Sequence, residues 1–96
     1  MHTTIRIPTP LRTYTGGQAE VPVQGATVEQ ALNHLITLYP SLRPHLFNGE
    51  GQLRAFVNLF VNDENIKDLQ GVHTPIKEND QLMLIPSIAG GIENQG

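Results

Sequence analysis

Hydrophobic and polar residues alternate in four stretches of the chain, and this period of two is typical of half-buried β-strands. The first two strands are expected at residues 3–7, where Ile5 and Ile7 share a face, and at residues 19–23. Pro22 lacks a backbone donor, so the second strand is expected at a sheet edge. A hairpin with a long, loose loop would join these two strands.

One stretch has helical periodicity instead. Thr27 is a good N-cap, and Gln30 three residues later completes a capping-box pattern. Pro40 ends the helix, and we expect a short turn within residues 41–47 and a loop at 48–51. The apolar stripe that the helix would bury consists of Val28, Ala31, Leu32, Leu35 and Tyr39.

The last two predicted strands are residues 54–62 and 81–85, joined by a short, irregular segment around residues 66–72. In the first of them one face carries Ala55, Val57, Leu59 and Val61, and the other carries Phe56, Asn58, Phe60 and Asn62. In the second, the residues on opposite faces are Leu82 and Leu84 against Met83 and Ile85.

The order of these elements predicts an α+β fold with one helix on one face of a small sheet. A β-grasp satisfies this order: a mixed, ubiquitin-like sheet of four to five strands wraps around one main helix, with the first and last strands adjacent. The length of 96 residues fits one domain, which we expect to span residues 1–86.

Composition narrows the class of function. A net charge of -3 and the lack of any Lys/Arg cluster give no support for nucleic-acid binding. The chain has no cysteine, no apolar run long enough to span a membrane and no signal-peptide pattern, so a cytoplasmic location is expected. Its four histidines show no ligand spacing, and nothing suggests a catalytic triad, so we expect no bound metal or cofactor and no independent enzyme.

Small, uncharged residues follow the last strand and end in the pair Gly90-Gly91. Residues 87–91 could extend roughly 15 to 18 Å at about 3.3 Å per residue. Since glycine lacks a Cβ, such a stalk is thin enough for a narrow enzyme channel. Residues 92–96 then form a short C-terminal extension.

A second candidate site is apolar. If Leu82 and Leu84 face the helix, then Met83 and Ile85 face outward beside Phe60, and the three could form an exposed patch that binds a partner. The alternative is that residues 40–53 fold over this patch as a secondary core.

Three stretches carry a family resemblance: RIPTPLRTYTGGQAEV (6–21), FVNLFVNDENI (56–66) and ENDQLMLIPSIAGG (78–91). With these the chain resembles the ubiquitin-like sulfur carriers of the MoaD/ThiS superfamily, and in particular the CysO-type carriers of cysteine biosynthesis. The resemblance covers the whole domain. It implies that Gly91 is the reactive terminus, with Ala89 and Gly90 as its stalk.

The resemblance also implies the chemistry and the partners. An E1-like adenylating enzyme would activate the Gly91 carboxylate with ATP, and a sulfur donor would convert the acyl adenylate into a thiocarboxylate. In the CysO branch, a pyridoxal-phosphate cysteine synthase receives that sulfur. The carrier is then a cosubstrate of its partner enzymes, and ATP is used by the partner.

The extension departs from the family pattern, because an amide to Ile92 blocks the Gly91 carboxyl group and an amide cannot be adenylated. Some relatives are trimmed by a zinc-dependent metallopeptidase of the JAMM class, so cleavage after Gly91 is expected. Other functions stay open: a ubiquitin-like protein modifier, a sulfur carrier for molybdopterin, thiamin or tRNA thiolation, and a non-covalent β-grasp interaction module.

Overall fold

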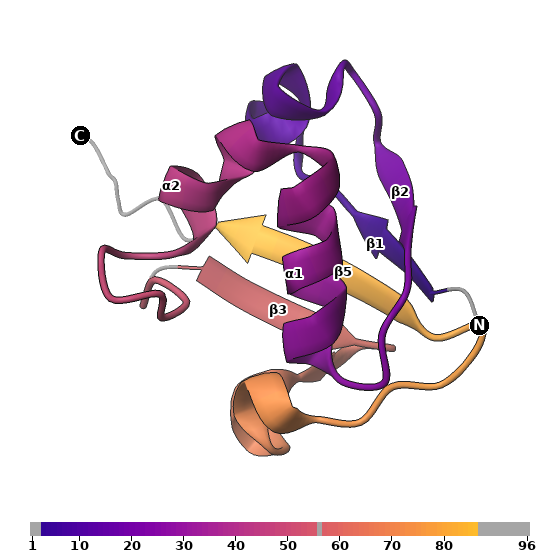
Figure 1. Ribbon diagram of the computed structural model, residues 1–96. Helices are drawn as coiled ribbons and strands as arrows, with labels where there is room; N and C mark the ends of the chain where they lie inside the picture. The colour runs from indigo at the N-terminus through magenta and orange to yellow at the C-terminus, as the bar shows by residue number, and fades with distance from the viewer. Residues whose placement is uncertain (1–2, 56, 87–96) are drawn as a thin grey trace.

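Figure 1 shows a computed structural model of the chain, in which residues 3–55 and 57–86 are described. The strands are β1 (Thr3–Arg6), β2 (Glu20–Val23), β3 (Val57–Val61), β4 (Glu64–Asn65) and β5 (Gln81–Pro86). The α-helices are α1 (Val28–Leu38) and α2 (Arg43–Leu46). The 3-10 helices are η1 (Thr9–Thr15), η2 (Pro40–Leu42), η3 (Ile66–Asp68) and η4 (Gly71–His73).

The five strands form one mixed sheet in the order β2-β1-β5-β3-β4. The first and last strands are adjacent and parallel, with Ile5 opposite Leu82, and the other strand pairs are antiparallel. β2 lies at the edge, where Pro22 is tolerated. These features confirm the predicted β-grasp.

The helix α1 begins where the sequence predicted it. Thr27 has extended backbone angles, and its Oγ1 accepts a hydrogen bond from the Gln30 backbone N–H at 3.3 Å. The Gln30 side chain in turn accepts one from the Ala26 N–H at 2.8 Å. Two backbone donors at the start of the helix are thus satisfied without water.

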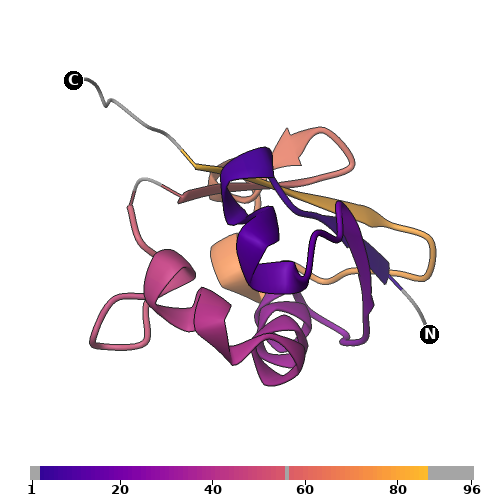
Figure 2. The same ribbon diagram turned by 90° about the horizontal axis from the view of Figure 1, so that it is seen from above.

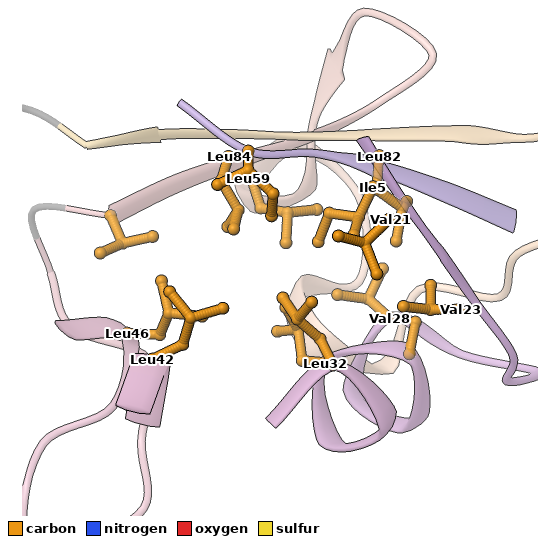
Figure 3. Packing of buried hydrophobic residues seen from close by; sticks show 14 of the residues in the cluster. Ile5, Val21, Val23, Val28, Leu32, Leu42, Leu46, Leu59, Leu82 and Leu84 are labelled. Atoms are coloured by element: carbon orange, nitrogen blue, oxygen red, sulfur yellow. The ribbon is translucent and has the colours of Figure 1, made fainter. Parts of the chain in front are cut away.

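One core lies between the sheet and the helices (Figure 3). The sheet contributes Ile5, Leu59, Leu82 and Leu84, which face Leu32 of α1. Figure 2 shows α1 and α2 on the same side of the sheet. Burial of these side chains supplies the main stabilising free energy, at about 25 cal/mol per Å² of apolar surface.

Three expectations about local structure were wrong. Residues 9–15 form η1 rather than a loose loop, since Leu11 and Thr15 are buried there and the Thr15 hydroxyl lies 2.9 Å from the Gln18 carbonyl. The third strand begins at Val57, so Ala55 is an exposed turn residue and does not line the core. Residues 64–65, where no strand was expected, form the short strand β4.

Gly25 offers a test of how the chain enters α1. A Cβ at this position would lie 2.7 Å from the Ala31 nitrogen and 2.8 Å from the Gln30 Cβ. We expect Gly25→Ala to lower the free energy of unfolding by roughly 1–3 kcal/mol, because backbone must move to accept the methyl group. Urea denaturation measures this change.

Gly49→Ala is the matched control, because a Cβ at Gly49 would meet nothing within 4 Å. This variant should unfold at the wild-type urea concentration or slightly above it. Equal midpoints for the two variants would contradict the packing described at the start of α1.

Candidate functional site

The strand β5 positions the predicted stalk. It is hydrogen-bonded to β1 on one side and to β3 on the other, and its last residue, Pro86, is in register with Val57 of β3. The predicted reactive residue Gly91 and the stalk residues Ala89 and Gly90 lie outside the described residues. What the structure provides is their anchor, a central strand that is paired with β1 over residues 81–83 and with β3 up to Pro86.

Alternation along β5 separates a buried face from an exposed one. Leu82 and Leu84 are 1% and 2% exposed, and they belong to the core beneath the sheet. Met83 and Ile85 are 38% and 41% exposed, although both side chains are large and apolar. The sheet therefore presents apolar surface to solvent along its central strand.

The strand register brings two of the predicted patch residues side by side. Phe60 of β3 is opposite Met83 of β5, and Ile85 lies two residues further along β5 on the same face. Phe60 is half-buried. We call Phe60, Met83 and Ile85 the apolar patch.

The structure does not support the alternative in which residues 40–53 cover this patch. Leu42 of η2 and Leu46 of α2 are fully buried in the core, and Figure 2 shows α2 on the helix side of the sheet. The segment packs there because Leu42 and Leu46 both point at the sheet from below (Figure 3). The opposite face of the sheet keeps the apolar patch exposed.

Charged residues continue the same row of side chains. Arg6 of β1 is opposite Met83, and Glu20 of β2 is opposite Arg6. The Arg6 Nη1 and Glu20 Oε2 atoms are 3.7 Å apart, and both side chains are 57% exposed. An ion pair this exposed contributes little to stability, so Arg6 is available to a partner.

A groove runs beside the apolar patch, between β5 and η1. Its volume is about 210 Å³, and we call it the η1 groove. Six of the residues that line it are Arg6, Pro8, Thr9, Arg12, Met83 and Ile85. The Arg12 Nε–H donates to the Ile7 carbonyl at 3.0 Å, which holds the guanidinium at the groove.

Sequence reasoning missed both arginines of this groove as candidate site residues. Arg6 lies between Ile5 and Ile7 in the first predicted strand, but nothing in the pattern indicated that Met83 would be its neighbour. Arg12 lies in PTPLR, within the first stretch that carries the family resemblance, and the resemblance assigned it no role. Only the pairing of β1 with β5 brings these residues together.

Two histidines make structural contacts. The Nδ1 atom of His34 accepts a hydrogen bond from the Gln24 N–H at 2.8 Å, which ties α1 to the end of β2. The ring of His45 lies 4.2 Å from that of Tyr14, measured between centroids. Residues 3–55 and 57–86 contain no cluster of three or more His, Cys, Asp or Glu side chains that could hold a metal ion.

A mixed five-stranded sheet that wraps around one helix and ends in a central strand defines a ubiquitin-like β-grasp protein. The sequence pattern of the ThiS family matches residues 5–91 of the chain. The chain belongs to the ThiS family.

Individual relatives agree with this assignment. The chain is 37% identical over 93 residues to the sulfur carrier protein CysO of Mycobacterium tuberculosis, and the match covers 95% of this chain and 100% of that protein. The crystal structure of the BexX/CysO complex from Amycolatopsis orientalis contains a chain that is 36% identical, with a TM-score of 0.85 and coverage of 93% of this chain and 99% of that one.

A third relative represents a different use of the fold. The solution structure of small archaeal modifier protein 1 from Methanosarcina acetivorans matches with a TM-score of 0.83 at 27% identity. That match covers 94% of this chain and 96% of the modifier. The chain described here is thus a homologue of sulfur carriers, and its structure also resembles that of a ubiquitin-like modifier.

Within residues 3–55 and 57–86, no helix combines the length and the apolar character that crossing a bilayer requires.

Neighbouring residues of β5 test the division into a buried and an exposed face. We expect Leu84→Ala to lower the free energy of unfolding by about 2–4 kcal/mol, because it opens a cavity in the core. Ile85→Ala should cost roughly 1 kcal/mol or less, because its side chain is already in contact with water. Chemical denaturation followed by circular dichroism gives both values, and equal losses would show that the assigned faces are wrong.

Proposed function

We propose that this sulfur carrier is activated by hydrolysis after Gly91 and then carries sulfur as a thiocarboxylate on that residue. The main support for this proposal is the position at which the match to the ThiS family ends. The match stops at residue 91, at the second residue of the Gly90-Gly91 pair, while the chain continues for five more residues. Residues 92–96 are therefore beyond the part that this chain shares with its family.

The chemistry requires a free carboxylate at Gly91. One carboxylate oxygen attacks the α-phosphorus of ATP, pyrophosphate leaves, and an acyl adenylate forms. Hydrosulfide (HS⁻) released by a sulfur donor then attacks the acyl carbon, AMP leaves with the bonding electrons, and the sulfur loses its proton to solvent. The product is a thiocarboxylate whose sulfur anion is a strong nucleophile at the end of a thin stalk.

The domain contributes presentation and docking to this reaction. β5 is paired with β3 up to its last residue, Pro86, so it holds the start of the stalk in place. Two residues of the apolar patch, Met83 and Ile85, lie on the same strand, and the patch supplies a surface on which an E1-like adenylating enzyme can dock. No step requires a catalytic group of the carrier itself, so the carrier acts as a cosubstrate.

The similarity to CysO supports cysteine biosynthesis as the destination of the sulfur. The partners would then be an adenylating enzyme, a JAMM-type metallopeptidase that removes residues 92–96, and a pyridoxal-phosphate cysteine synthase. The BexX/CysO complex supports the view that a chain of this kind binds a second protein.

A second function, covalent protein modification, is favoured by the match to small archaeal modifier protein 1. The same activated carboxyl group would be attacked by a lysine amine of a target instead of by sulfur. Both functions need Gly91 exposed and adenylated, and they differ only in the nucleophile that takes the acyl group.

The first test compares chains that end at different residues. With the adenylating enzyme of its source organism, the chain ending at Gly91 should support ATP–pyrophosphate exchange. The chain ending at Gly96 should not, because its Gly91 carbonyl is an amide. A chain ending at Gly90 shares the folded domain and serves as the control for stalk length, and it should exchange poorly. Equal exchange by the chains ending at 91 and 96 would refute the proposal.

The second test addresses processing. Incubation of the full chain with a JAMM-type peptidase of its source organism should remove residues 92–96, as an intact mass spectrum would show. Replacing Gly90 and Gly91 with valine should block cleavage, because branched side chains widen the stalk without altering residues 1–86. An unchanged mass for the wild-type chain would exclude this route of activation.

The same spectra distinguish the two functions after a sulfur donor and the adenylating enzyme are added. Exchange of one oxygen for sulfur supports the carrier function. Heavier species in which Gly91 is joined to lysine support the modifier function.

A further inference from the structure

We propose that the η1 groove binds an acidic side chain of the adenylating enzyme, beside the channel that receives the stalk. This inference rests on the proposed function and adds a specific contact to it. Both charged residues of the groove, Arg6 and Arg12, are cations, although the chain as a whole has a net charge of -3. The groove is thus a local exception to the overall charge of the protein.

Because of its position, the groove must lie close to any enzyme that binds the stalk in its active site. Pro86 is the last residue of β5, and Gly91 is the fifth residue after it. A five-residue segment spans roughly 17 Å at most, at about 3.3 Å per residue. An enzyme that holds Gly91 in its active site must therefore bring the rim of its channel close to the end of β5. Ile85, at this end of β5, lines the groove together with Thr9 and Arg12.

The chemistry of the groove selects a carboxylate as its ligand. Arg12 uses its Nε–H for the Ile7 carbonyl, so its terminal Nη groups are the donors that face a ligand. Among the described residues no carboxylate pairs with Arg12, and Arg6 has only the exposed contact with Glu20. Two guanidinium groups at one groove match the planar, bidentate geometry of an Asp or Glu side chain.

The apolar patch and the η1 groove are continuous, so the groove extends the surface on which the adenylating enzyme is proposed to dock. Met83 and Ile85 belong both to the apolar patch and to the η1 groove. An apolar side chain of the enzyme would cover these two residues, and its acidic neighbour would reach Arg6 and Arg12. Apolar contact supplies affinity in such an interface, and the charged contact supplies orientation and association rate.

A role for the η1 segment follows from this arrangement. The stretch PTPLR builds one wall of the groove, with Leu11 buried as its anchor and Arg12 held beside the opening. Because Arg12 is half-buried and already hydrogen-bonded, less side-chain entropy is lost when it binds a ligand. The PTPLR stretch would thus serve partner recognition as well as folding.

The test measures binding of the chain ending at Gly91 to the adenylating enzyme of its source organism. Arg6→Glu should weaken binding about tenfold at low salt, chiefly through slower association. The acidic side chain of the enzyme would then be repelled by Glu at position 6 instead of being attracted by Arg6. Arg12→Gln should weaken it by roughly fivefold and reduce its dependence on salt. At about 0.5 M salt the differences should shrink, since screening then acts over only a few ångströms.

Lys77→Glu is the matched control. Lys77→Glu makes the same change in net charge as Arg6→Glu. Lys77 lies away from the groove, because its backbone carbonyl accepts a hydrogen bond from the Thr3 hydroxyl at the start of β1, and the groove is at the other end of that strand. This variant should bind within about twofold of wild type. Urea denaturation of each variant checks that the domain is folded, and Arg6→Glu alone decides the outcome if Arg12→Gln is unstable.

The two failures are distinguishable. If the wild-type chain supports ATP–pyrophosphate exchange while Arg6→Glu binds as tightly as Lys77→Glu at low salt, this inference is wrong and the proposed function stands. If the wild-type chain is not adenylated at all, the proposed function fails and this inference fails with it.

Discussion

The pairing of β5 with β1 on one side and β3 on the other is the constraint on which the rest of the molecule depends. It makes the last strand the centre of the sheet, with Leu82 and Leu84 in the core and Met83 and Ile85 in solvent. It also fixes where the chain leaves the domain. The end of β5 from which the stalk leaves is paired with β3 up to Pro86, and residues 81–83 of the same strand are also paired with β1, so the exit point of the chain is fixed by the sheet. A carrier handed between enzymes needs such an anchor.

Much of the fold could be predicted from local patterns. The capping residues Thr27 and Gln30 located the helix, and alternation separated Leu82 and Leu84 from their exposed neighbours. The pattern failed at η1, where prolines and polar residues carry no clear period and tertiary burial of Leu11 decides the structure. It also failed at β4, because two residues are too few to show alternation.

The candidate site was predictable only in part, since it combines local sequence with long-range pairing. The resemblance assigned the reactive role to Gly91, and alternation indicated that Met83 and Ile85 would be exposed. The contact of Met83 with Arg6 depends on the parallel pairing of β1 with β5, which joins residues far apart in the sequence. The η1 groove depends in turn on that pairing, so no local pattern could have indicated it.

The central claim is that the acyl carbon of Gly91 is the reacting atom and that hydrolysis exposes it. The most direct measurement is the intact mass of the protein isolated from its own cells under sulfur limitation and again after sulfur is supplied. We expect the fed cells to contain a chain that ends at Gly91 and carries a terminal sulfur. A protein that retains residues 92–96 under both conditions, with no sulfur or target joined to Gly91, would contradict it.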